Sequence, residues 1–202
     1  MDDELRQHSA PADRNKGPIT AELLRLLPAQ GQLLEIASGT GQHAAFGACA
    51  LPGWQWQPTD LNPHALSSID AWCEGLQNVR PALVLDVTAS VWPGVPASVD
   101  AMLCANMLHI APWAACAGLM QGAGRHLSAQ GLLVLYGPYV VDGETTVPSN
   151  VAFDADLRRR NPDWGLRCLA DVLSQAQAAG LQLQQRLHMP ANNLLLVLSR
   201  QG

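Results

Sequence analysis

A glycine-rich turn is the first feature of the sequence whose residue types and spacing could support chemistry. A short apolar run over residues 33–37 ends at the turn Ser-Gly-Thr-Gly, residues 38–41, and an alanine-rich stretch follows. A buried strand, a glycine turn and a helix in that order are typical of cofactor-binding loops in α/β proteins. The pattern through Ala44 also satisfies the dinucleotide fingerprint G-x-G-x-x-A. The turn by itself therefore leaves the cofactor open, and a purely structural turn is the alternative.

Three carboxylates lie at the ends of predicted strands, and their positions distinguish between cofactors. Glu35 is near the end of the first strand, Asp60 ends the second and Asp86 ends the third. In a parallel sheet all three project toward the same edge, where they would oppose the dianionic pyrophosphate of a dinucleotide. S-adenosylmethionine instead brings a sulfonium, an ammonium, a ribose diol and an adenine amine, which suit carboxylates. The sequence therefore favours S-adenosylmethionine, with S-adenosylhomocysteine as the product.

Each carboxylate has an expected partner on this cofactor. Asp60 would accept hydrogen bonds from the ribose hydroxyls, Asp86 would accept from the adenine amine, and Glu35 would help to hold the amino-acid end. The alternative for each is a solvated acid at a strand end or, for Asp86, a helix N-cap. That alternative is weak for Glu35, because an unpaired buried carboxylate is costly. The expected cofactor site comprises Arg14, Asn15, Glu35, Ala37, Ser38, Gly39, Gly41, His43, Asp60, Asp86, Val87, Asn106 and Met107.

Two further residues are candidates for catalysis. His109 follows the fourth predicted strand and titrates near neutral pH, so it could remove a proton from an acceptor that must lose one early. The alternative is that His109 caps or packs the next helix. Tyr136 ends the fifth predicted strand and could point its hydroxyl into an acceptor cavity, or simply pack. We see no spacing of ligand residues that indicates a metal site.

The elements that must position these residues alternate between strands and helices. Runs of apolar or alternating residues predict strands over residues 33–37, 54–57, 83–85, 101–105 and 132–136. Helices are predicted over residues 42–51, 62–75, 111–127 and 169–179. Two closing strands, around residues 181–187 and 194–198, are joined so closely that they must be antiparallel neighbours. The predicted fold is therefore α/β, with a mostly parallel sheet and helices on both faces.

We expect one domain over residues 1–202, with two segments outside this alternation. Residues 1–17 are polar and predict an N-terminal arm, in which Arg14 and Asn15 would fold over the cofactor or belong to a disordered terminus. Residues 137–167 contain three prolines and little periodicity. That stretch predicts an irregular insert, which could act as a lid over the acceptor.

Composition and charge exclude several classes of protein. The formal net charge is −5, which disfavours a nucleic-acid partner, since binding to a phosphate backbone needs a dense basic surface. No apolar run approaches the roughly 20 residues that span a bilayer, and no signal peptide is present, so no membrane partner is expected. Five cysteines without a C-x-x-C pair fit reduced thiols and a cytoplasmic location. The sequence carries no feature that sets an oligomeric state.

Several motifs together resemble one known family, the DUF938 or methyltransferase-like protein 26 family. The resemblance covers nearly the whole chain and is carried by residues 14–16, 35–43, 56–58, 85–88, 106–113, 135–138, 153–154, 164–165 and 189–193. It implies a Rossmann-like class I methyltransferase fold, whose seven-stranded sheet has an antiparallel last strand. Ala37 stands where the broader methyltransferase signature has a glycine, which is tolerable if the backbone there needs no positive φ. The Asn-Pro-Pro-Tyr/Phe motif of nucleic-acid amino-methylating enzymes is absent.

The sequence thus predicts a methyltransferase that uses S-adenosylmethionine. It would transfer the methyl group in line to a small molecule or to a protein side chain. One alternative is a scaffold that keeps the fold and the cofactor site without turnover, because a fold does not prove an activity. The other is an NAD-type oxidoreductase, which rests on the glycine pattern alone and against which Glu35 argues.

Overall fold

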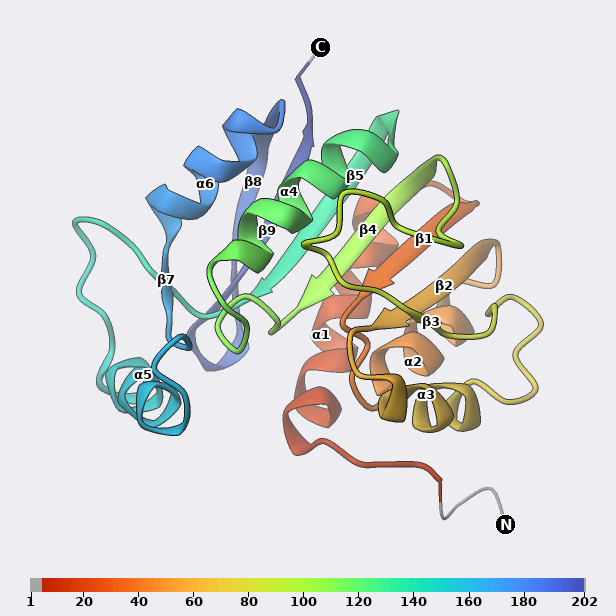
Figure 1. Ribbon diagram of the computed structural model, residues 1–202, viewed down its shortest axis with the longest axis horizontal. Helices are drawn as coiled ribbons and strands as arrows, with labels where there is room; N and C mark the ends of the chain where they lie inside the picture. The colour runs from red at the N-terminus through yellow and green to blue at the C-terminus, as the bar shows by residue number, and fades with distance from the viewer. Residues whose placement is uncertain (1–4, 202) are drawn as a thin grey trace.

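The computed structural model describes residues 5–201 and centres on one seven-stranded sheet (Figure 1). The first four residues of the predicted arm lie outside the described residues. The strands are β1 (Gly31–Ile36), β2 (Trp54–Asp60), β3 (Leu83–Val84), β4 (Val99–Ala105), β5 (Leu127–Gly137), β8 (Leu181–Met189) and β9 (Asn193–Arg200). Their spatial order is β3-β2-β1-β4-β5-β9-β8. β1 to β5 pair in parallel, and β9 runs antiparallel to both of its neighbours. The predicted fold class and the reversed last strand are confirmed.

Helices cover both faces of the sheet, as the alternation predicted. One hydrophobic cluster joins the sheet to α4 (Ala114–His126) and α6 (Leu169–Ala178), and a second joins it to α1 (Ala10–Leu26), α2 (Gln42–Ala50) and α3 (Leu66–Trp72). Figure 1 shows the two groups of helices on opposite sides of the sheet. Among the described residues, no helix is both long and apolar enough to cross a membrane.

The central strands are buried on both faces, and their alternation assigns each side chain to one of these clusters. In β1, Leu34 and Ile36 belong to the cluster with α4 and α6, whereas Leu33 belongs to the cluster with α1 to α3. Glu35 lies on the same face as Leu33, because successive side chains of a strand point to opposite sides. The strand therefore directs the Glu35 carboxyl into the layer beneath α2, and the turn after β1 lies beyond it.

The predicted N-terminal arm is wrong from residue 10 onward, because α1 begins at Ala10. Ser9 is its N-cap, with Oγ accepting from Ala12 N at 3.4 Å, and Pro11 occupies the first turn, where a missing N–H costs nothing. Contacts with α2 hold this end. Ser9 N donates to Gln42 Oε1 at 2.6 Å, and Gln42 Nε2 donates to Asp13 Oδ1 at 2.8 Å. Pro18 lies inside the helix.

The insert predicted to be irregular over residues 137–167 is also largely ordered. It contains α5 (Pro148–Arg160), and the short strand β6 (Tyr139–Val140) pairs in parallel with β7 (Arg167–Cys168). Pro148 starts α5 instead of breaking a helix, because a proline in the first turn gives up only a donor that has no partner there. The segment is therefore a helix held beside the sheet, and its position next to the cavity described below is what matters for function.

Candidate functional site

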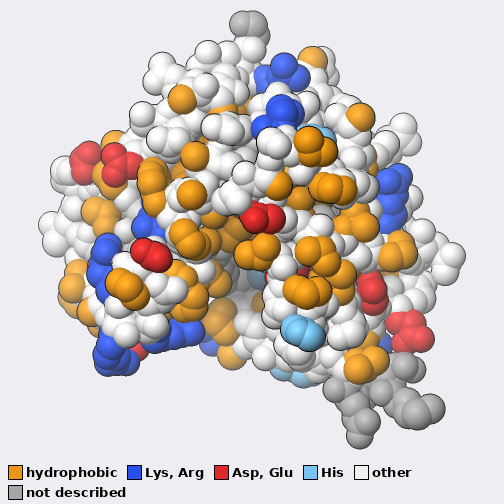
Figure 2. Space-filling model, in the orientation of Figure 1, with side chains coloured by type: hydrophobic (Ala, Val, Ile, Leu, Met, Phe, Trp, Pro, Cys, Tyr) orange, Lys and Arg blue, Asp and Glu red, His pale blue; other side chains and the backbone are white. Residues whose placement is uncertain are grey.

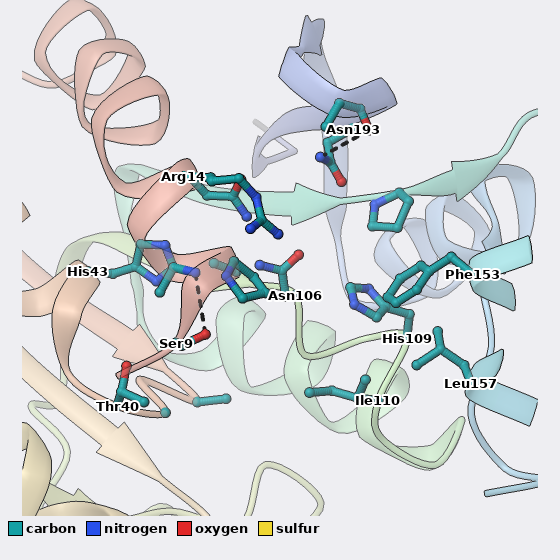
Figure 3. A pocket seen from close by; sticks show the side chains of 18 of the residues that line it. Ser9, Arg14, Thr40, His43, Asn106, His109, Ile110, Phe153, Leu157 and Asn193 are labelled. Carbon is teal, nitrogen blue, oxygen red and sulfur yellow. Dashed lines mark hydrogen bonds between the residues drawn. The ribbon is translucent and has the colours of Figure 1, made fainter. Parts of the chain in front are cut away.

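One cavity of about 780 Å³ lies at the carboxyl ends of the parallel strands. Its walls come from the residues after β1, β2, β4 and β5, from the first turns of α1, from α5 and from the turn between β8 and β9. Figure 2 shows a hollow on this face bordered by hydrophobic side chains, and Figure 3 shows side chains from these separate elements converging on it. Ligands of open α/β sheets bind in this position, so the cavity is the candidate site.

The glycine turn forms the wall of the cavity nearest β1 and β2. Gly39 and Gly41 both have positive φ, at 60° and 93°. A Cβ on Gly41 would lie 2.6 Å from the Cα of Ile69, so α3 packs directly on the turn at a place where only glycine fits. Gly39 lines the cavity, whereas Gly41 fixes the turn from behind.

Ala37 lines the same wall in a conformation that the sequence argument did not foresee. Its φ is 55°, so the condition for replacing the signature glycine without cost is not met. A residue with a Cβ in the left-handed region is strained by about 1–2 kcal/mol. The strained residue lies at the start of the turn that lines the cavity, and backbone strain often occurs at functional sites.

Replacing Ala37 with glycine is therefore expected to stabilise the fold by about 1 kcal/mol, because the relieved strain exceeds the extra freedom of glycine in the unfolded chain. The measurement is urea unfolding, with a higher midpoint and an unchanged m-value. Ala21→Gly is the matched control. Ala21 is exposed in the interior of α1, where the same substitution should destabilise by about 1 kcal/mol. Equal effects of the two substitutions would contradict the prediction.

Asp60 links the turn to the end of β2. Its Oδ2 accepts from Gly39 N at 2.9 Å, and its Oδ1 accepts from Asn62 N at 2.8 Å. Each carboxylate oxygen therefore keeps acceptor capacity, and Asp60 lines the cavity. The group is positioned to accept hydrogen bonds from a ligand that offers two neighbouring donors.

Arg14 and Asn15 reach the cavity from α1. Arg14 lines it with no hydrogen bond or ion pair to another described residue (Figure 3). Asn15 also lines it, and its Oδ1 accepts from the Tyr136 hydroxyl at 3.0 Å. Tyr136 itself is buried and does not line the cavity. The structure therefore places the Tyr136 hydroxyl behind Asn15, where it fixes the amide instead of meeting an acceptor.

Two histidines line the cavity in uncharged form. Burial lowers the pKa of His43 to about 4 and that of His109 to about 4, with Lys16 and Arg167 adding smaller effects in the same direction. Nε2 of His43 is buried and has no partner among the described residues. Both rings are therefore neutral near pH 7 and able to accept or donate one hydrogen bond.

His109 belongs to a braced loop between β4 and α4. The loop starts with Asn106 at φ 63°, and Arg167 donates to the carbonyl oxygens of Leu108 and Ala111 at 2.9 and 2.6 Å. The His109 ring lies edge-on to Phe153 of α5, with 5.5 Å between centroids. α4 begins only at Ala114, so His109 does not cap it. Asn106 and His109 both line the cavity.

Several residues expected at the cofactor lie outside the cavity wall. Burial raises the pKa of Glu35 to about 7, and its Oε2 accepts from Trp56 Nε1 at 2.8 Å. Val87 and Met107 pack in or against the core. Oδ1 of Asp86 accepts two bonds from Thr88, at 2.8 Å from the backbone N and 2.7 Å from Oγ1. The expected site residues that do line the cavity are Arg14, Asn15, Ala37, Ser38, Gly39, His43, Asp60, Asn106 and His109.

The sequence argument missed the side of the cavity that α5 provides. Phe153, Leu157 and Arg160 line it from one face of that helix, and Asn193 lines it from the start of β9. The spacing of four and three residues was a readable helical signal. Two apolar positions make only a narrow stripe, and the three prolines and little periodicity of residues 137–167 predict an irregular segment. Among the described residues, no three metal-ligating side chains come together.

Comparison with known proteins gives one family and many solved structures of the same fold. The family model described as "Protein of unknown function (DUF938)" matches residues 6–200. The S-adenosylmethionine-dependent methyltransferase SibL is 21% identical with a TM-score of 0.77, and the match covers 95% of this chain and 56% of that one. CalO1, a methyltransferase in calicheamicin biosynthesis solved with S-adenosylhomocysteine, is 19% identical with a TM-score of 0.71, at 90% and 54% coverage.

One of the similar solved structures has nearly the same length as this chain. A putative methyltransferase from Bacillus halodurans C-125 is 16% identical with a TM-score of 0.71, and the match covers 91% of this chain and 99% of that one. By contrast, the chain spans little more than half the length of SibL and CalO1. At these identities the likeness establishes the Rossmann-like methyltransferase fold.

Proposed function

This chain belongs to the DUF938 family, and from its methyltransferase fold and its cavity we infer that it is an S-adenosylmethionine-dependent methyltransferase. The observation that carries the proposal is Asp60. A carboxylate with free acceptor capacity lies on the cavity wall and is hydrogen-bonded to the glycine turn. A ribose diol would be held there. An acid in this place also serves dinucleotides, so the choice of S-adenosylmethionine rests in addition on the methyltransferase fold with its reversed strand β9.

The other groups on the cavity wall fit the remaining parts of this cofactor. Nε2 of His43 and the guanidinium of Arg14, which have no partner among the described residues, suit the amino-acid end, where a carboxylate and an ammonium need partners. The Asn106 side chain offers an amide beside them (Figure 3). Asp86 stays the proposed partner of the adenine amine, because Thr88 engages only Oδ1 of its carboxylate.

We assign Glu35 an indirect role, since its carboxyl lies below the turn. Its backbone oxygen accepts from Thr59 Oγ1 at 2.7 Å, and Ser38 N donates to Thr59 O at 2.8 Å. These bonds tie the end of β1 to the end of β2, so they fix the separation of the turn from Asp60. Val87, Met107 and Gly41 support the same wall from the core side.

When held by Asp60, Arg14 and His43, S-adenosylmethionine would supply the methyl group for in-line transfer, with S-adenosylhomocysteine as the product. The protein's part is to align the acceptor and to exclude water. His109 faces the cavity and is uncharged near pH 7, so it can accept a hydrogen bond from the methyl acceptor. Its pKa of about 4, below the near-neutral value expected from the sequence, makes it a weak base, so its proposed role is to orient an acceptor proton that leaves as the methyl group is transferred. Tyr136 acts through Asn15 as a positioning residue.

The test is calorimetric titration of the purified protein with S-adenosylmethionine, S-adenosylhomocysteine and NADH. We expect dissociation constants in the micromolar range for the first two, about −8 kcal/mol, and no heat of binding for NADH. Turnover would then be sought by release of S-adenosylhomocysteine over a panel of small-molecule acceptors. Binding of NADH without binding of either S-adenosyl ligand would overturn the proposal.

A further inference from the structure

The inner face of α5 forms an apolar wall opposite the glycine turn. Phe153 and Leu157 line the cavity from this helix, and Ile110 faces them from the loop after β4 (Figure 3). Phe153 and Ile110 are 37% and 44% exposed, which is high for such large apolar side chains. With the neutral ring of His109 between them, they make a surface that a flat apolar group would cover.

The last turn of α5 carries three arginines, and only one of them lines the cavity. Arg158 donates to Asp154 at 2.9 Å, and Arg159 donates to Asp156. Arg160 makes no such hydrogen bond, and its nearest carboxylate oxygen, on Asp156, is 3.9 Å away. Its guanidinium lies 5.2 Å from the centroid of the Trp164 ring. Arg160 therefore lies near an aromatic ring beside the cavity, and apart from the long ion pair with Asp156 no described residue takes its donors.

The charges around the cavity favour a negatively charged second ligand. Among the described lining residues, two guanidinium groups, Arg14 and Arg160, stand against the single carboxylate of Asp60. Both lining histidines are neutral near pH 7. The proposed cofactor itself carries one net positive charge. An acceptor with a positive charge would be repelled by this arrangement, whereas an anion would balance it.

We propose that the acceptor is a small, flat, apolar carboxylic acid, whose body packs on Phe153 and Ile110 and whose carboxylate pairs with Arg160. The acceptor's place beside the cofactor rests on the proposed function. The charge preference of the α5 side of the cavity does not depend on it. Figure 2 shows positively charged side chains gathered over α5 at the edge of the hollow, where such an acid would enter.

Three matched probes test this preference without relying on turnover. We would titrate 2-naphthoate, 2-naphthamide and 2-naphthylmethylamine by calorimetry, both with and without saturating S-adenosylhomocysteine. The three share one flat body and differ in charge. Naphthoate is expected to bind at least tenfold more tightly than the amide, about 1.4 kcal/mol, and the amine more weakly than either. Equal affinities of naphthoate and naphthamide would overturn the proposal.

Two neighbouring variants locate the effect. Arg160→Gln should abolish most of the preference for naphthoate over naphthamide, whereas Arg159→Gln should leave it intact. Both variants remove one positive charge beside Asp156, but only Arg160 lines the cavity. An equal loss in both would show a general charge effect and would also contradict the proposal.

The same titrations separate this inference from the proposed function. If the protein prefers naphthoate but does not bind S-adenosylhomocysteine, the anion site is supported and the proposed methyltransferase function is contradicted. If the protein binds S-adenosylhomocysteine but shows no preference among the probes, the proposed function is supported and the anion site is contradicted.

Discussion

Glu35→Gln is expected to stabilise the protein increasingly as the pH rises from 5 to 8. Burial raises the pKa of Glu35 from an ordinary 4.5 to about 7. Between these values the unfolded chain has lost this proton and the folded protein still holds it, so the carboxyl lowers stability as the pH rises through the interval. Glutamine has no such proton, and its side-chain oxygen can still accept from Trp56 Nε1. The gain from the substitution should therefore grow by about 2–3 kcal/mol between pH 5 and pH 8.

Urea unfolding of both proteins at pH 5, 6, 7 and 8 measures this difference. Glu74→Gln is the control, because it makes the same chemical change at a largely exposed glutamate outside the core. His43 and His109, whose pKa values are lowered to about 4, reduce stability as the pH falls from 6.5 toward 4. They act alike in wild type and variant, so they cancel. A Glu35→Gln effect that is the same at every pH would show that the folded carboxyl is already ionised.

Asp60→Ala is expected to weaken binding of S-adenosylhomocysteine tenfold or more, at least about 1.4 kcal/mol. The substitution removes the cavity's single carboxylate among the described lining residues, and with it the acceptor proposed for the ribose hydroxyls. It also frees the backbone N–H groups of Gly39 and Asn62, which loosens the turn. Calorimetric titration measures the change in affinity, and a parallel unfolding curve measures any loss of stability.

Asp100→Ala separates these two effects. Asp100 lies at the opposite end of the sheet, and its Oδ2 accepts from Gln32 N at 3.0 Å, much as Asp60 accepts from Gly39 N. The control therefore also loses a bond between a carboxylate and a neighbouring strand's backbone, but far from the cavity. Its affinity for S-adenosylhomocysteine should not change. If Asp60→Ala bound as tightly as Asp100→Ala, the proposed position of the ribose would be wrong.

The parts of this site that depend on elements adjacent in the sequence were predictable. Strand, glycine turn and helix follow one another within about twenty residues, and Asp60 ends the next strand, so their meeting at one edge follows from parallel topology. The face of Glu35 was not predictable in the same way. β1 is buried on both sides, and its apolar run gives no period that would say which way Glu35 points.

The wall made by α5 escaped prediction for a different reason. Its arginines and aspartates pair along the exposed side, and Phe153 and Leu157 alone give a narrow apolar stripe. What sets this helix in place is remote contact. Gly165 N, just beyond it, donates to the His109 carbonyl at 3.0 Å, and Asn150 Nδ2 donates to the Asn192 carbonyl at 3.2 Å. Such partners are far apart in sequence, so only the folded chain reveals them.

The attachment of the first turns of α1 has a consequence for how the site opens. Gln7 N donates to Ser68 Oγ and Trp72 Nε1 donates to Gln7 O, at 2.9 and 2.8 Å, while Ser9 contacts Gln42. These few polar contacts hold a segment that also closes one side of the cavity. Local unfolding of that segment would open this side of the cavity, and a bound ligand would oppose it. Amide hydrogens of the first turns should exchange more slowly in the liganded protein, by a factor that reports occupancy.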